Sequence, residues 1–146
     1  MNPDSTPHRA LAVRFNNAAW DLLEQPTRSP EEDARMLYLA GAAFLHWQQA
    51  GGALEEQRAR HLLASVHGSL GQAALAQHQA ETLAARSAAG LPGETPFDGA
   101  CVAEAMVRAL RLAGRDTTDW QARAEAAAAA LSEEDRPFFV AMMARP

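Results

Sequence analysis

The sequence predicts an all-α protein, and three observations carry this prediction. Apolar residues recur at helical spacing along the chain, helix-capping and helix-ending residues punctuate it, and nothing alternates with the period of two typical of a strand. A chain of 146 residues forms one ordinary domain, and its 48% hydrophobic and 21% charged residues exclude a disordered chain. A domain of this size buries a sufficient core by itself, so we expect no cofactor.

The first helix pair is expected over residues 7–51. Thr6 and Pro7 supply an N-cap and a first-turn proline for a helix over residues 7–25, which Pro26 ends. The second helix begins at Ser29-Pro30-Glu31-Glu32, a capping box with proline at the first helical position, and it ends at two glycines, Gly51 and Gly52.

Two further helix pairs and a short final helix follow. Helices are expected over residues 54–70 and 72–89 with a break at Gly71, and over residues 98–113 and about 117–131 with a break at Gly114. The Gly- and Pro-containing segment 87–98 is the one real loop between them. Ser132 can cap the last helix, although Pro137 sits late for a first turn and shifts the expected start. Its apolar residues exceed what one face can hide, so part should cover the sixth helix and the rest is a possible homodimer contact; these residues are Phe138, Phe139, Met142 and Met143.

The segment around Gly71 can be superposed on the segment around Gly114 with a period of 43 residues. Leu63 then falls on Met106 and Val66 falls on Ala109, so both segments keep the same apolar face. A helix hairpin that recurs at this spacing is typical of a stacked helical array.

These residues resemble the tetratricopeptide repeat (TPR) family, in which a large and a small apolar residue stand side by side in helix A, a glycine makes the turn, and small residues line helix B. The matching residues are Leu63, Ala64, His67, Gly71, Ala76, Ala80 and Leu83. The resemblance implies a right-handed superhelical stack of about three hairpins with a short C-terminal capping helix. It also implies structural roles for Gly71, at the end of the third helix, and for Ala64, where the third and fourth helices approach closely. The expected single domain consists of a flexible N-terminus (1–6), a divergent first hairpin (7–51), a second hairpin (54–89), a third hairpin (98–131) and the capping helix (132–146).

The resemblance also implies a concave groove lined by the first helix of each hairpin. The groove-facing positions are Arg58, His61, Ser65, Ser69, Cys101, Glu104, Arg108 and Arg111. Arginines favour bidentate contacts to carboxylates, so the expected partner is a protein or peptide, possibly acidic, provided that Arg108 and Arg111 are solvent-accessible. The alternative is an ordinary solvated stripe, because Glu104 and Arg108 have the i, i+4 spacing of a surface ion pair.

Catalytic and metal sites are less well supported. No two histidines stand at i, i+4, so we expect no metal site. Cys101 lies in the first turn of a helix, where amide dipoles lower a thiol pKa, but a packing role is the commoner one for a lone cysteine. No acid, base and nucleophile stand at convincing spacing, so we expect no catalytic residues.

The net charge of −5 argues against a nucleic acid or an anionic membrane as partner. All thirteen basic residues are Arg, which excludes lysine Schiff-base chemistry. The first seven residues lack the apolar core of a signal peptide, so the expected location is the cytoplasm. The first hypothesis is a non-catalytic protein- or peptide-binding module. The alternatives are a small-molecule-binding or enzymatic protein that uses the cleft between helices three and five, and a structural homodimer subunit.

Overall fold

The computed structural model describes residues 5–146, and within this range all regular structure is helical, as the sequence predicts. Its helices are α1 (Ser5–Leu23), α2 (Pro30–Ala50), α3 (Ala53–Ser69), α4 (Ala73–Ala88), α5 (Pro96–Leu112), α6 (Thr118–Ala130) and α7 (Arg136–Ala144). The predicted flexible segment 1–6 lies outside the described residues up to residue 4. Ser5 and Thr6 belong to α1, so Thr6 lies inside the helix and not at its N-cap.

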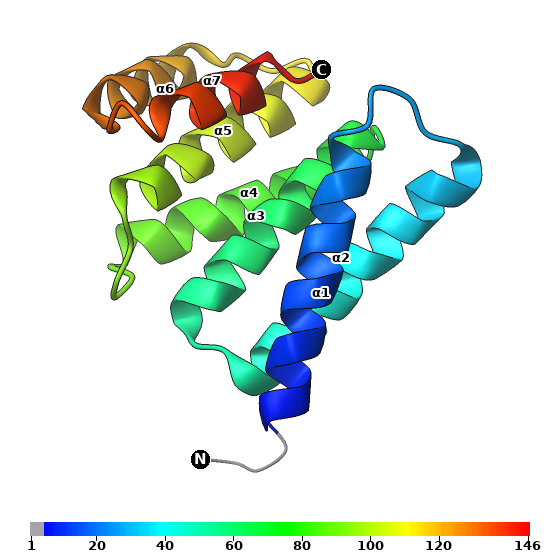
Figure 1. The fold of residues 1–146 in the computed structure, drawn as a ribbon. Coiled ribbons are helices and arrows are strands. Elements are labelled where there is room, and N and C mark those ends of the chain that lie inside the picture. Colours follow the sequence, from blue (N-terminus) through cyan, green and yellow to red (C-terminus); the bar gives the residue numbers. More distant parts are fainter. Residues whose placement is uncertain (1–4) are drawn as a thin grey trace.

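Consecutive helices pack against one another as pairs. Figure 1 shows α1 beside α2 at one end of the molecule, α3 beside α4 in the middle, and α5 beside α6 at the other end. Contacts of α2 with α3 and of α4 with α5 join the pairs, and α3 also contacts both α1 and α5. The helix α7 packs on α5 and α6. The first helices of the three pairs therefore lie side by side in the order α1, α3, α5.

Two helices begin with the same capping arrangement. The Ser29 side chain accepts a hydrogen bond from the backbone N–H of Glu32 (3.1 Å), and the Glu32 carboxylate accepts one from the backbone of Ser29 (2.8 Å), as predicted. Thr95 and Asp98 form the equivalent box at the start of α5. This second box places the start of α5 at Pro96, two residues before the predicted start, and shortens the expected loop.

The turns after α3 and α5 share one hydrogen-bond pattern. Gly71 (φ 72°) and Gly114 (φ 68°) adopt the left-handed conformation that favours glycine. The residue after each glycine donates its backbone N–H to a carbonyl in the last turn of the helix. Gln72 donates to His67 O and Arg115 donates to Leu110 O, each at a distance of 2.9 Å. This is the Schellman arrangement, and it confirms the prediction that Gly71 ends the third helix.

Small residues let the middle helices approach closely. Ala64 is buried in a cluster that joins α3, α4 and α5, as expected of a structural position. The helix α7 buries Phe139 and Met142 against α5 and α6, whereas Phe138 is 65% exposed. The last helix therefore covers the end of the core with only part of its apolar surface.

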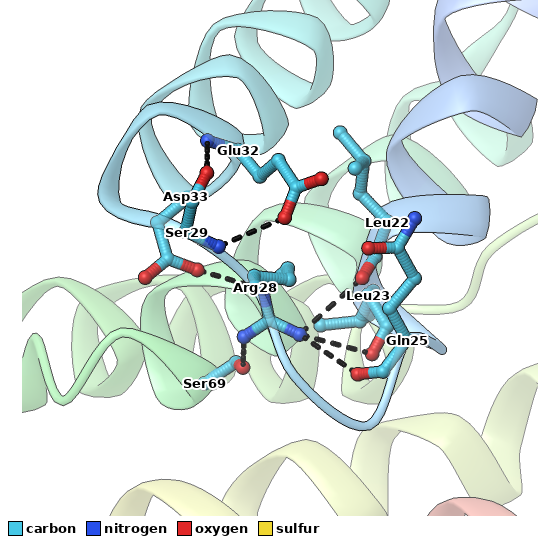
Figure 2. A network of polar contacts seen from close by, with 8 residues as sticks. All are labelled: Leu22, Leu23, Gln25, Arg28, Ser29, Glu32, Asp33 and Ser69. Carbon is cyan, nitrogen blue, oxygen red and sulfur yellow. Dashed lines mark hydrogen bonds and ion pairs between the residues drawn. The ribbon is translucent and has the colours of Figure 1, made fainter.

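Arg28, in the connection between α1 and α2, holds three helix ends together (Figure 2). One guanidinium nitrogen donates to backbone carbonyls at and just after the end of α1, which belong to Leu22, Leu23 and Gln25. The Nε atom donates to Asp33 in the first turn of α2 (2.7 Å), and the other terminal nitrogen donates to Ser69 at the end of α3 (2.7 Å). A single side chain thus fixes the first helix pair to the second.

Replacing Arg28 with Leu should lower the free energy of unfolding by about 2 kcal/mol, because the aliphatic side chain leaves the carboxylate of Asp33 and the α1 carbonyls without their charged donor. The loss is measured by urea denaturation. The matched control is Arg35→Leu, since Arg35 is exposed on α2 and its replacement should change stability by less than about 0.5 kcal/mol. Equal stability of the two variants would contradict this role for Arg28.

Candidate functional site

A pocket of about 240 Å³ opens between α1, α3 and α5. Its lining combines aromatic and aliphatic walls with a few polar groups, a combination typical of ligand sites. The lining residues are Asn16, Trp20, Gln57, Arg58, His61, Leu83, Phe97, Asp98, Cys101 and Val102. Three of the eight groove residues expected from the sequence therefore meet in one pocket: Arg58, His61 and Cys101.

Arg58 and Asp98 form a bidentate ion pair beside the pocket. Arg58 donates from Nε to Oδ1 (2.9 Å) and from a terminal nitrogen to Oδ2 (3.0 Å) of Asp98. Burial alone would raise the pKa of Asp98, but the hydrogen bonds from Arg58 and Thr95 outweigh burial and hold this pKa below its usual value. Asp98 also caps α5, so the capping box fixes the carboxylate that orients Arg58. The Arg58 side chain remains 53% exposed and keeps donors for another group.

Behind the pocket, Glu104 accepts hydrogen bonds from two other helix positions. The Glu104 carboxylate is 2% exposed, and it contacts His61 Nε2 (2.9 Å) from α3 and Arg108 (2.8 Å) one turn further along α5. Burial alone would raise the pKa of Glu104, but the hydrogen bonds from His61 and Arg108 and the charge of Arg108 outweigh burial and lower this pKa. Arg108 also donates to backbone oxygens of Met142 (3.0 Å) and Pro146 (2.9 Å). The network therefore joins α3, α5 and the end of α7.

Cys101 lines the pocket, but its environment disfavours the thiolate. Burial raises the pKa of the Cys101 thiol, and the nearby negative charges of Glu104 and Asp98 raise it further. The expectation that the start of the helix lowers this pKa is therefore wrong, because burial and the two carboxylates oppose it. A thiol held in its neutral form is a poor nucleophile, so Cys101 contributes a wall of the pocket.

The remaining expected groove residues lie away from the pocket. Ser65 is buried, Ser69 accepts the hydrogen bond from Arg28, and Arg111 is exposed at the end of α5. The condition that both arginines of α5 are solvent-accessible is not met, because the Arg108 side chain is only 11% exposed and is occupied by Glu104 and the end of α7. The ion pair of Glu104 and Arg108 exists, but it is buried and not part of a solvated stripe.

Sequence reasoning missed several pocket residues: Asn16, Trp20, Gln57, Leu83, Phe97, Asp98 and Val102. Asp98 could have been found, because Thr95 and Asp98 repeat the spacing of the Ser29 capping box. The contact of His61 with Glu104 could also have been found, since the two residues are 43 positions apart and equivalent positions of stacked helices lie side by side. Trp20 belongs to α1, for which the sequence offers no matching pattern.

The fold and the pocket define an all-helical protein with an aromatic-lined pocket between three of its helices. The chain matches no family model, no curated protein and no solved structure. None of the helices between residues 5 and 146 has both the length and the apolar character needed to cross a membrane. Over the same residues, no three His, Cys, Asp or Glu side chains are arranged to hold a metal ion.

Replacing Glu104 with Gln should lower the free energy of unfolding by about 3 kcal/mol at neutral pH, because the buried Arg108 loses its counter-charge. The folded pKa of Glu104 lies below the ordinary value of 4.5, so the carboxylate stabilises the fold above that pH and loses this effect as the pH falls through the folded pKa. The difference in the free energy of unfolding between the parent and the Glu104→Gln variant should therefore become smaller as the pH falls.

The measurement is urea denaturation of both proteins at a series of pH values from 7 downwards, with the exposed Glu133→Gln as the control. A Glu104→Gln variant that matches the parent at neutral pH, or that keeps a constant difference at every pH, would contradict the role assigned to this carboxylate.

Proposed function

We propose that this chain is a non-catalytic helical-repeat module, a TPR-like stack of helix hairpins, that binds a protein or peptide segment in the groove between α1, α3 and α5. In this proposal α1, α3 and α5 are the first helices of successive hairpins, and the pocket between them anchors one side chain of the bound segment.

The repeated geometry of α3 and α5 supports the stacked arrangement. Both helices have 17 residues, both begin with an N-cap residue whose backbone N–H donates to the carboxylate three residues later, Glu55 in α3 and Asp98 in α5, and both end in a Schellman turn at a left-handed glycine. His61 and Glu104 stand at equivalent positions of the two helices and touch. Contact between equivalent positions is what a regular stack of hairpins produces.

The observation that carries the binding proposal is the pocket itself. Apart from Leu83 on α4, its lining comes from the first helix of each proposed hairpin, and it includes two aromatic rings, Trp20 and Phe97. Aromatic rings in a concave site are the usual anchors for a bound side chain. Arg58, which is half exposed, supplies hydrogen-bond donors beside the pocket.

The chemistry of the pocket supports binding over catalysis. The pKa of the one cysteine thiol is raised by burial and by the carboxylates of Asp98 and Glu104. Those two carboxylates are themselves held by arginines, so neither is poised to take or give a proton at neutral pH. Since Arg58 and Arg108 are already paired, the pocket provides an anchor for a side chain with apolar surface more readily than for a free acidic group.

Filling the pocket should weaken binding. Asn16 lies on α1 in the lining of the pocket, and Asn16→Trp puts a large ring into the space that the ligand would take. Its neighbour Asn17 is exposed and does not line the pocket, so Asn17→Trp is the matched control. Peptides selected from a random library on the parent protein should bind the control equally and the Asn16→Trp variant at least about tenfold more weakly.

Thermal unfolding checks that both variants stay folded. Asn17 is exposed, so Asn17→Trp should change stability by less than about 0.5 kcal/mol, and Asn16→Trp should still unfold cooperatively because its ring enters the open pocket and not the packed core. A library from which no peptide is enriched, or peptides that bind Asn16→Trp as tightly as the parent, would contradict the proposal.

A further inference from the structure

The hydrogen bond between His61 and Glu104 determines which ring nitrogen carries a proton. Glu104 is buried and ionised beside Arg108, so its carboxylate can only accept. His61 Nε2, which lies 2.9 Å from a carboxylate oxygen, must therefore donate. In the neutral imidazole this arrangement leaves Nδ1 without a proton and with a lone pair available to accept a hydrogen bond.

That lone pair has no partner among the residues that the structure describes. The His61 side chain is 8% exposed, and its Nδ1 forms no hydrogen bond to any residue whose side chain the structure describes. Within the described residues, Arg60 Nε is the one side-chain nitrogen or oxygen that is both shielded from solvent and without a hydrogen-bond partner. His61 Nδ1 also has no partner, so it is not shielded from solvent. His61 lines the pocket, so the pocket contains an unused hydrogen-bond acceptor on a side chain that is otherwise buried. Buried polar groups are normally satisfied, and a ligand with a donor would satisfy this one.

The walls around this acceptor suit a flat ring. Trp20 contacts Arg145, whose guanidinium lies 5.5 Å from the ring centroid, and His61, whose ring centroid lies 5.9 Å away. Phe97 forms another wall, and the half-exposed Arg58 can cover the face of a ring that enters the pocket. Asn16 also lines the pocket, and both its amide and the Arg58 guanidinium can hydrogen-bond to the backbone carbonyls of a bound chain.

We propose that the pocket recognises an aromatic side chain that carries its own hydrogen-bond donor, the indole of Trp or the phenol of Tyr in a bound peptide, with the donor directed at Nδ1 of His61. This inference rests on the proposed function, since it names the group that the groove anchors. It excludes an aliphatic side chain or a bare phenyl ring as the preferred anchor.

The test uses the whole chain and synthetic peptides of the form acetyl-Gly-Gly-X-Gly-Gly-amide. In one peptide X is Trp, and in the other X is 3-benzothienylalanine, which has nearly the same shape but has sulfur in place of the indole N–H. Titrations followed by nuclear magnetic resonance should show the Trp peptide binding about fivefold more tightly, the ratio expected of one net hydrogen bond. The shifts should centre on Cys101 and Val102, disappear in Asn16→Trp and persist in Asn17→Trp.

Three results would overturn the inference. Equal affinities of the two peptides would mean that no donor is recognised. Free indole that binds as tightly as the Trp peptide would assign the pocket to a small aromatic molecule and not to a peptide side chain. No binding of the Trp peptide, while library-selected peptides without Trp or Tyr bind the same groove, would refute this anchor and leave the proposed function standing.

Discussion

The buried carboxylate of Glu104 is the constraint on which the arrangement of α3, α5 and α7 depends. A carboxylate that is 2% exposed is tolerated only if its oxygens are fully bonded, and His61 and Arg108 supply those bonds. Arg108 then reaches the end of α7, and His61 forms part of the pocket wall. The same side chain therefore holds helices together and orients the ring that faces the pocket. The binding site that we propose therefore includes a side chain that the protein already orients, which lowers the entropy cost of the proposed binding.

Much of the fold could be predicted because helix ends leave local signatures. Ser29, Gly71 and Gly114 mark helix ends by chemistry that operates within a few residues, and all three occupy the predicted turns or caps. The predicted start of α5 lies two residues too late, because the prolines and glycines before it indicate a loop, whereas Thr95 caps the helix there. The superhelical course of the hairpins is a property of how helices pack over long distances, and it stays a prediction.

The candidate site was predicted only in part, for a physical reason. Arg58, His61 and Cys101 share one pocket, as neighbouring helices of a stack would place them. The pairing of Glu104 with Arg108 follows from their i, i+4 spacing, but spacing on one helix says nothing about burial. Burial here comes from α3 and α7, which are distant in sequence.

The protonation of the His61 ring tests this account most directly, because the fold and the pocket both depend on it. In the protein labelled with ¹⁵N, the two ring nitrogens of His61 give distinct resonances for a protonated and an unprotonated nitrogen. The account predicts a protonated Nε2 that is coupled to Glu104 and an unprotonated Nδ1. A proton on Nδ1, whether or not Nε2 also carries one, would contradict it.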